Sequence, residues 1–218
     1  MTEHPDPIRD PLYDRPPTSH ERMTGLPWNA SYDNGPPPWD IGRPQPAVEL
    51  LAAEGGFSGA VLDAGCGTGE NALYIAALGL AVLGVDVAET ALESARAKAV
   101  LRGIDVEFVT ADALRLGRLE RAFDTVLDCG LFHTFNDVER SQYEESLASV
   151  TEPGGTLHVL CFSDTGQDLG PHPVSQGALR AVFDRGGRWR VDTIQPHRLQ
   201  TRDHDLGAPA WLATIRRV

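Results

Sequence analysis

Three glycines at alternate positions, near residue 65, carry the strongest chemical signal in the chain. The segment DAGCGTGE spans residues 63–70 and contains Gly65, Gly67 and Gly69. Glycine accepts the positive φ angles of a tight turn, and without a Cβ atom it lets a ligand come close to the backbone. A helix that begins after such a loop points its free N–H groups and positive dipole end at that ligand. The loop therefore predicts a site for a small polar molecule.

Two later carboxylates extend this site toward a nucleoside. Asp86 ends a second apolar stretch, at the position where a carboxylate of a βαβ unit accepts both ribose hydroxyls. Asp112 follows a third apolar stretch and can accept from an adenine amino group. The alternatives are a helix N-cap for Asp86 and an ordinary acidic turn for Asp112. Taken with the glycine loop, the pair predicts a nucleoside pocket.

The residue after the last glycine argues against a dinucleotide. The fingerprint G-x-G-x-x-G requires glycine at position 70, where this chain has Glu70. An acidic side chain there would repel a pyrophosphate, so the loop suits a ligand with a carboxylate and an amine. A nucleotide-dependent oxidoreductase is the less favoured alternative.

Composition limits the possible partners. The 218 residues carry 19 basic and 31 acidic side chains, a net charge of −12, and 41% are hydrophobic. These values predict a soluble globular protein, and the negative charge disfavours nucleic acid as a partner. No apolar run reaches the roughly 20 residues of a membrane-spanning helix. Cys66, Cys129 and Cys161 are too widely spaced for a zinc site, and reduced thiols predict a cytoplasmic protein without a metal.

Strands and helices alternate from residue 60 onward, which places the site in a fold. Strands are predicted at residues 60–63, 81–85, 106–109, 123–127, 156–162, 188–194 and 211–216. Helices are predicted at residues 46–54, 71–78, 89–102 and 136–150, with another after Ser175. This alternation predicts an α/β fold with a doubly wound, mostly parallel sheet, whose ligands bind beyond the carboxyl ends of the strands.

The first 46 residues hold 11 of the 16 prolines and are predicted to form two parts. Residues 1–25 bury little apolar surface and are expected to be a flexible arm. Residues 26–46 contain Trp28, Tyr32 and Trp39, which are costly to leave in water. We expect this second part to be a lid over the site and residues 47–218 to form the main domain.

These residues resemble the class I S-adenosylmethionine-dependent methyltransferases. Asp63 and the three glycines resemble the first motif of that family, Asp86 its ribose-binding acid, and Asp112 with Ala113 its adenine contact. Asp128 and Cys129 match a segment whose backbone contacts the methionine part. The resemblance implies a Rossmann-like seven-stranded sheet with the last strand antiparallel. It also implies S-adenosylmethionine as cofactor and S-adenosylhomocysteine as product.

The segment PWDIGRPQP, residues 38–46, resembles the thiopurine and halide/thiol methyltransferase group. That group places aromatic rings of this segment over the cofactor, which implies cofactor contacts for Trp28 and Trp39. The sequence GPHPV at residues 170–174 resembles a further loop of the group, with His172 in place of a proline. The resemblance implies transfer to a small-molecule acceptor, a thiol, a halide or a heteroatom on an aromatic heterocycle, by a monomer or weak homodimer. Alternatives are O- or N-methylation of a quinone or phenol, and a catalytically silent cofactor-binding protein.

The acceptor is expected beside the segment that follows Asp128. His133 is the candidate general base or acceptor-orienting group, the alternative being a histidine bonded to the backbone. Tyr32, Phe132 and His172 are the candidate substrate-binding residues, with core packing as the alternative for Phe132. His197 and His204 flank two acids, but their spacing fits no metal site, and we expect solvated hairpin residues there.

Overall fold

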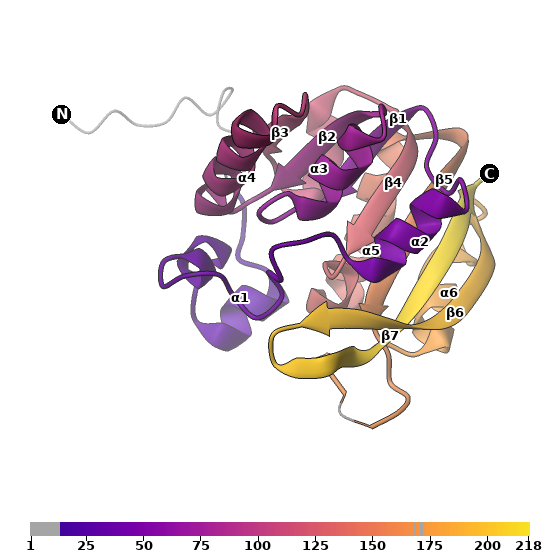
Figure 1. Ribbon diagram of the computed structural model, residues 1–218. Helices are drawn as coiled ribbons and strands as arrows, with labels where there is room; N and C mark the ends of the chain where they lie inside the picture. Colours follow the sequence, from indigo (N-terminus) through magenta and orange to yellow (C-terminus); the bar gives the residue numbers. More distant parts are fainter. Residues whose placement is uncertain (1–13, 168, 171) are drawn as a thin grey trace.

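The described residues (14–167, 169–170 and 172–218) of this computed structural model form one seven-stranded sheet (Figure 1). The strand order is β3-β2-β1-β4-β5-β7-β6, and β7 runs antiparallel to both of its neighbours. This arrangement confirms the predicted α/β fold with its antiparallel last strand. The strands are β1 (Ala60–Ala64), β2 (Ala81–Asp86), β3 (Glu107–Thr110), β4 (Phe123–Cys129), β5 (Thr151–Phe162), β6 (Trp189–Thr201) and β7 (His204–Arg217).

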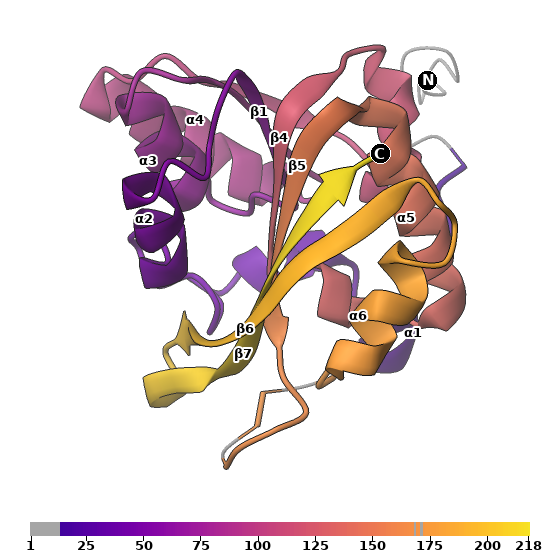
Figure 2. The ribbon, with the colours of Figure 1, turned by 90° about the vertical axis from the view of Figure 1, so that its right-hand side faces the viewer.

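Helices cover both faces of the sheet, as Figure 2 shows nearly edge-on. One face carries α2 (Pro46–Ala53), α3 (Glu70–Ala77) and α4 (Glu89–Arg102), and the other carries α5 (Asp137–Val150) and α6 (Gln176–Phe183). Because both faces are covered, β1 and β2 are near-continuous apolar runs rather than alternating ones. The sheet reverses its order between β1 and β4, where Ala64 of β1 is paired with Asp128 of β4.

The last strands are longer than the sequence predicted. The β6–β7 hairpin extends well past the predicted ends at residues 194 and 211, and its tip reaches the N-terminal part of the chain (Figure 1). Strand β5 begins at Thr151 rather than at the expected residue 156, so the Pro-Gly-Gly sequence at residues 153–155 lies inside it, next to an irregularity in the pairing with β4. Residues in such an irregularity do not alternate between apolar and polar, so the sequence pattern does not reveal that they belong to a strand.

The described part of the expected flexible arm has a defined structure, which corrects that expectation. Helix α1 (Ser19–Thr24) follows a capping box formed by Thr18 and Glu21, both of which are buried. Glu21 also receives two hydrogen bonds from Arg15, at 3.1 and 2.6 Å. Residues 1–13 lie outside the described part. A 3-10 helix, η1 (Trp28–Tyr32), follows α1 and begins the expected lid.

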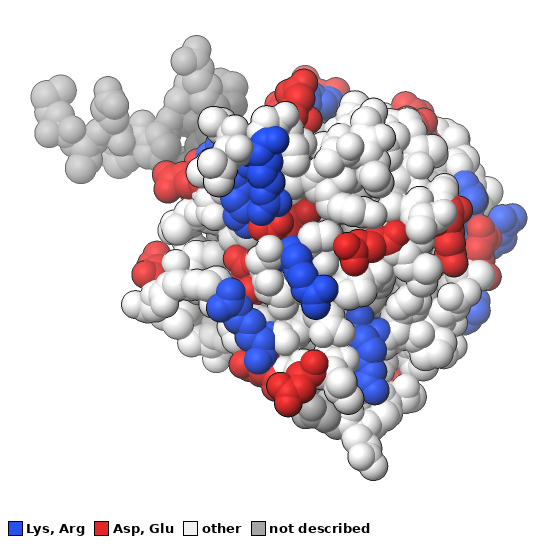
Figure 3. Space-filling view, viewed as in Figure 1, with Lys and Arg blue, Asp and Glu red and all other residues white. Residues whose placement is uncertain are grey.

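Charge on the surface is mixed in sign. Figure 3 shows acidic and basic side chains interspersed over the viewed face, without one continuous basic tract. Among the described residues, no helix is both long enough and apolar enough to cross a membrane.

Candidate functional site

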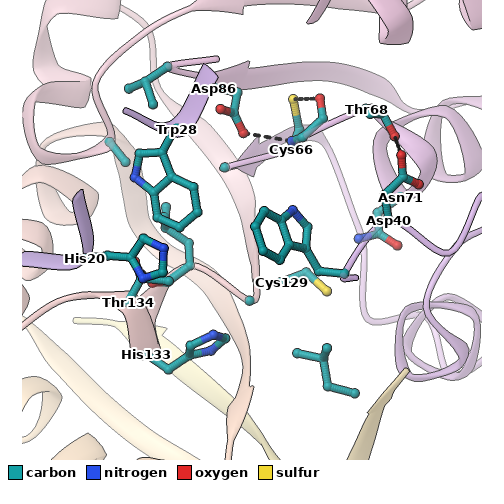
Figure 4. A pocket seen from close by; sticks show the side chains of 18 of the residues that line it. His20, Trp28, Asp40, Cys66, Thr68, Asn71, Asp86, Cys129, His133 and Thr134 are labelled. Atoms are coloured by element: carbon teal, nitrogen blue, oxygen red, sulfur yellow. Dashed lines mark hydrogen bonds between the residues drawn. The ribbon is translucent and has the colours of Figure 1, made fainter. Parts of the chain in front are cut away.

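A cavity of about 280 Å³ lies beyond the carboxyl ends of β1, β2 and β4, where the family of parallel-sheet folds binds ligands (Figure 4). Its floor comes from the glycine loop and the strand ends, and its roof from residues before α2. The predicted residues that line it are Trp28, Tyr32, Trp39, Gly65, Gly67, Asp86, Asp112, Ala113, Cys129, His133 and His172. Asp63, Gly69, Asp128 and Phe132 do not line it.

The glycine loop adopts the conformation that its sequence requires. Gly67 has φ +53°, and a Cβ atom there would lie 3.2 Å from the Tyr32 hydroxyl. Gly69 has φ +81° and is the N-cap of α3, so the helix starts as predicted, directly after the loop. The free N–H groups at that helix start therefore lie at the cavity.

Asp86 holds the loop in place. Its Oδ2 accepts a hydrogen bond from the Gly67 N–H (2.8 Å), and its Oδ1 accepts one from the Ala88 N–H (2.9 Å) (Figure 4). The N-cap of α4 is Ala88, so Asp86 is not the helix cap of the alternative interpretation. Burial raises the pKa of Asp86, which the two N–H groups counteract. Each carboxylate oxygen has a second lone pair for a ligand hydroxyl.

Asp112 both caps a turn and lines the cavity. Its Oδ1 accepts from the Leu114 N–H (3.0 Å) at the start of the turn η2 (Ala113–Leu119). The expected acidic turn and the expected ligand contact are compatible, since Asp112 lines the cavity and, among the described residues, its Oδ2 forms a 3.7 Å ion pair with Arg115.

Asp63 supplies buried negative charge beneath the loop. It is 1% exposed, and although the backbone N–H of Ala72 faces it and lowers its pKa, neither oxygen accepts a hydrogen bond of ordinary geometry from a described residue. Burial raises the pKa of Asp63 to about 7, and the charges of Asp128 and Asp86 add to the effect. An isolated buried carboxylate is costly unless a cation compensates it. Because S-adenosylmethionine carries an ammonium and a sulfonium group, this site fits that cofactor.

Asp128 is buried in the same layer. Its Oδ1 accepts from the N–H groups of Leu131 (3.0 Å) and Phe132 (3.2 Å), which shapes the turn after β4. Burial raises the pKa of Asp128 to about 7 despite these bonds. Two carboxyl groups under the cavity thus titrate near neutral pH.

We expect the affinity for S-adenosylmethionine to rise as the pH increases from 6 to 8. The folded pKa values of Asp63 and Asp128 lie above the ordinary 3.8, so they favour folding below about pH 4, and that contribution is lost as pH rises through 7. A bound cation favours the ionised carboxylates and releases a proton. Affinity for S-adenosylmethionine should therefore fall roughly tenfold from pH 8 to pH 6.

Calorimetry in two buffers of different ionisation enthalpy measures the affinity and the number of protons released on binding. Asp63→Asn should flatten the dependence of affinity on pH. A flat wild-type profile would contradict the assignment.

Glu70 is neutralised, contrary to the expectation that it repels an anionic ligand. Its carboxylate accepts from Lys98 Nζ (2.8 Å) and from both terminal nitrogens of Arg102 (2.8 and 3.0 Å). Both partners lie in the C-terminal half of α4, so the pairs join the start of α3 to the end of α4. Glu70 therefore orders the loop rather than selecting the ligand by repulsion.

The roof is a cluster of aromatic rings. Trp39 stands edge-on to Trp28 and to Tyr32, with centroids 5.9 and 6.4 Å apart, and its Nε1 donates to the Tyr32 hydroxyl (3.2 Å). The Tyr32 hydroxyl lies against the glycine loop, and burial, together with the nearby charge of Asp86, raises its pKa. Tyr32 thus lines the cavity beside the glycine loop, whereas the sequence assigned it to the substrate.

Several hydrogen bonds hold the roof to the body of the protein, at Asn29, Pro38, Asp40 and Gln45. Asn29 Oδ1 accepts from the Thr90 N–H of α4 (2.9 Å). The N–H of Arg202, at the β6–β7 tip, donates to the Pro38 carbonyl (2.8 Å). The Gln45 side chain exchanges two bonds with the backbone of Gln200, at 2.9 and 2.8 Å.

The hairpin tip was missed as part of the site. Thr201, Asp203 and His204 line the cavity, although the sequence predicted solvated residues there. Their hydrogen-bonded approach to the roof depends on the length of β6 and β7, which no local pattern in the sequence reports.

His133 and Phe162 form the far end of the cavity. Their rings lie 4.4 Å apart, and His133 is 7% exposed. The ring of His133 has no hydrogen bond to a described residue, so it is not the backbone-bonded histidine of the alternative interpretation. Burial lowers the pKa of His133 to about 3, with the neighbouring His172 and His20 contributing. The imidazole is therefore neutral at pH 7 and a weak base.

Phe132 belongs to the core, which corrects its assignment to the substrate. It is fully buried, packs 5.7 Å from the ring of Phe183, and lies under the guanidinium of Arg140. His172 does line the cavity, and its backbone has φ +54° before Pro173. This conformation is unfavourable for a residue other than glycine, particularly before proline, so the surrounding loop imposes it.

The fold and a cavity suited to a nucleoside are those of cofactor-dependent α/β transferases. Comparisons with known proteins identify the family within this class. A methyltransferase domain model matches residues 61–155. The 2-heptyl-1-hydroxyquinolin-4(1H)-one methyltransferase of Mycobacteroides abscessus is 40% identical over 167 residues, 75% of this chain and 73% of that protein. Probable thiol methyltransferase 2 of Arabidopsis thaliana is 29% identical over 147 residues, 66% of this chain and 65% of that protein.

A solved structure agrees with these relatives. It comes from work on the conversion of a disulfide bond into a thioacetal group during echinomycin biosynthesis, and it matches with a TM-score of 0.78 and 38% identity. The match covers 87% of this chain and 91% of the other. The chain belongs to the S-adenosylmethionine-dependent methyltransferases, and S-adenosylmethionine is its cofactor.

Proposed function

We propose that this methyltransferase acts on a planar aromatic heterocycle and methylates a heteroatom on its ring. The observation that carries the proposal is the ring-lined far end of the cavity, where His133, Phe162 and Trp28 offer flat surfaces. A flat acceptor gains stacking contacts in such a slot. The relative that acts on a hydroxyquinolinone supports this acceptor class.

The residues of this chain have separable tasks in the transfer. Bound S-adenosylmethionine supplies an electrophilic methyl group on a sulfonium with a good leaving group. Asp86 and Asp112 hold the nucleoside, the glycine loop and the Cys129 backbone position the methionine part, and Asp63 neutralises its positive charge. The roof excludes water, which removes the solvent shell of the incoming nucleophile. Holding the acceptor atom in line with the methyl group supplies several kcal/mol.

His133 orients the acceptor rather than acting as the general base that removes its proton. A neutral imidazole donates or accepts one hydrogen bond, and with a pKa of about 3 it takes up a proton poorly. The site therefore suits acceptors that lose a proton readily, such as ring hydroxyls next to a heteroatom. Aliphatic alcohols would need a stronger base.

A sulfur acceptor is the second candidate. The specific observations that favour it are the likeness to a thiol methyltransferase and to a protein of disulfide-to-thioacetal conversion. A thiolate needs no base, so a weakly basic His133 is compatible with it as well.

An acceptor panel tests the proposal. Release of S-adenosylhomocysteine is measured with a hydroxyquinoline, a phenol, a thiol and iodide. We expect kcat/KM for the hydroxyquinoline to exceed that for the phenol by at least about tenfold, since the fused ring fills the slot. Preference for the thiol or iodide would support the sulfur candidate. Cofactor binding without turnover of any acceptor would indicate a catalytically silent binding protein.

We also propose that residues 26–46 close over bound cofactor. Three aromatic side chains of this segment line the cavity, so a bound cofactor would add contacts to the hydrogen bonds that already join the segment to the body. Amide hydrogen exchange across this segment is expected to slow when S-adenosylmethionine is added, whereas exchange in α6 should not change. Equal protection with and without the cofactor would contradict a lid.

A further inference from the structure

We infer that His20, on the N-terminal helix α1, positions the acceptor by holding a second polar atom of it while His133 holds the first. The inference rests on the proposed function and narrows its substrate class. The acceptor would be a planar ring system with two hydrogen-bonding atoms, rather than one with a single hydroxyl. His20 lies in the segment that the sequence assigned to a flexible arm.

The geometry of His20 is that of a fixed side chain in the cavity wall. Its ring stacks on Trp28 with centroids 4.3 Å apart and planes 9° from parallel, and it meets the edge of His172 at 5.8 Å (Figure 4 shows His20 and Trp28). All three side chains line the cavity. The stack fixes the plane of the imidazole, so its nitrogens have a defined direction.

The hydrogen-bonding capacity of His20 is unused. Nδ1 of His20 and Nδ1 of His133 are enclosed and without a partner among the described residues, so Nε2, which has no hydrogen bond to a described residue either, is the nitrogen of each ring that is left for a ligand in the cavity. Burial also lowers the pKa of His20, so a neutral ring, with one donor and one acceptor nitrogen, prevails at pH 7. Two unsatisfied imidazoles in one cavity are costly unless a ligand satisfies them.

Glu139 holds α1 in the position that brings His20 to the cavity. Its Oε1 accepts from the Ser19 N–H (2.6 Å) and from Arg22 Nη2 (3.0 Å), and its Oε2 accepts from the Ser19 hydroxyl and the Asn136 N–H. The same carboxylate thus completes the capping box of α5 and anchors α1. Glu139 does not line the cavity, so it acts on the acceptor only through the position of α1.

Two isosteric probes test the inferred hydrogen bond between His20 and the second polar atom of the acceptor. 8-hydroxyquinoline and 1-naphthol share a shape and a hydroxyl, but only the quinoline has a ring nitrogen. Binding of each is measured by calorimetry with S-adenosylhomocysteine present, and turnover is measured separately. We expect the wild type to favour the quinoline by about tenfold, the ratio that one hydrogen bond of ordinary strength gives.

Variants separate the hydrogen bond from the stack. His20→Phe keeps the ring on Trp28 and should bring the ratio close to one, whereas His20→Asn should retain part of the preference. Glu139→Gln should raise KM for the quinoline and speed hydrogen exchange in α1, with cofactor affinity unchanged. His197→Ala, away from the cavity, is the control that should leave all values unchanged. Melting temperatures establish that each variant is folded.

The outcomes distinguish the inference from the proposed function. A probe ratio that is the same in His20→Phe and in the wild type overturns the inference, even if both probes are methylated. A His20-dependent binding ratio without turnover supports the inference and overturns the proposed activity on such rings. Loss of cofactor binding in His20→Phe would also overturn it, because His20 would then serve the cofactor.

Discussion

Replacing Asp86 by alanine is expected to weaken S-adenosylmethionine binding by roughly a hundredfold or more. Asp86 accepts hydrogen bonds from the N–H groups of Gly67 and Ala88, and in the proposed arrangement its remaining lone pairs accept from the ribose hydroxyls. Loss of hydrogen bonds to a charged group costs about 1.5–3 kcal/mol, which corresponds to roughly 10- to 150-fold in affinity. The loosened loop adds to this loss, because the cofactor must then order Gly67 as well.

Calorimetric titration measures the effect, and two variants interpret it. Asp86→Asn keeps the shape and one acceptor oxygen, so it should bind the cofactor more tightly than Asp86→Ala. Asp105→Ala removes an exposed carboxylate after α4 and should leave affinity unchanged. If Asp86→Ala stays folded and binds the cofactor as the wild type does, the nucleoside is not held at the end of β2.

Gly69→Ala is expected to be the most destabilising small substitution in the loop. At φ +81° an alanine is strained by about 1–2 kcal/mol. Its Cβ atom would also lie 2.6 Å from the Phe108 ring and 2.8 Å from Ala95 Cβ, and such overpacking costs about 1–3 kcal/mol. We expect a total near 3 kcal/mol and a fall in melting temperature of roughly 6–12 °C.

Gly79→Ala is the matched control, because that glycine has φ +90° but nothing within 4 Å of a Cβ atom. It should cost only the backbone strain, about 1–2 kcal/mol, or roughly 2–8 °C. The difference between the two variants measures the packing of α4 and β3 against the loop. Equal melting temperatures for both would show that Phe108 moves aside without cost.

The sheet and the cofactor end of the site were predictable because their signals are local. Buried parallel strands read as short apolar runs, and each ends at a residue of the site, Asp63 in β1 and Asp86 in β2. The expected bounds of α4 agree with the structure, since Gly103 ends the helix in a left-handed conformation. Family membership and cofactor follow from the same few positions.

The acceptor end was only partly predictable because it is built by contacts between distant parts of the chain. Ser19 meets Glu139, and Gln45 meets Gln200, pairs that no spacing rule connects. One local signal for α1 was present, since Thr18 and Glu21 have the spacing of a capping box. The high proline content of residues 1–25 nevertheless led to the expectation of a flexible arm. Phe132 was misassigned because an apolar residue after a strand end is equally compatible with a pocket and with the core.

The roof of the cavity has a consequence for how the specificity of this enzyme can change. Residues 14–45 supply His20, Trp28 and Trp39 as one continuous stretch of chain, whereas the sheet and its loops supply the cofactor end. The stretch is anchored to the rest through Glu139, Thr90, Thr68 and the hairpin tip, and it also brings Tyr32 against the glycine loop. One continuous stretch of chain thus carries part of the acceptor end, so chimaeras with related enzymes that exchange it would replace the roof and its contacts to the loop together while His133 and the sheet stay in place.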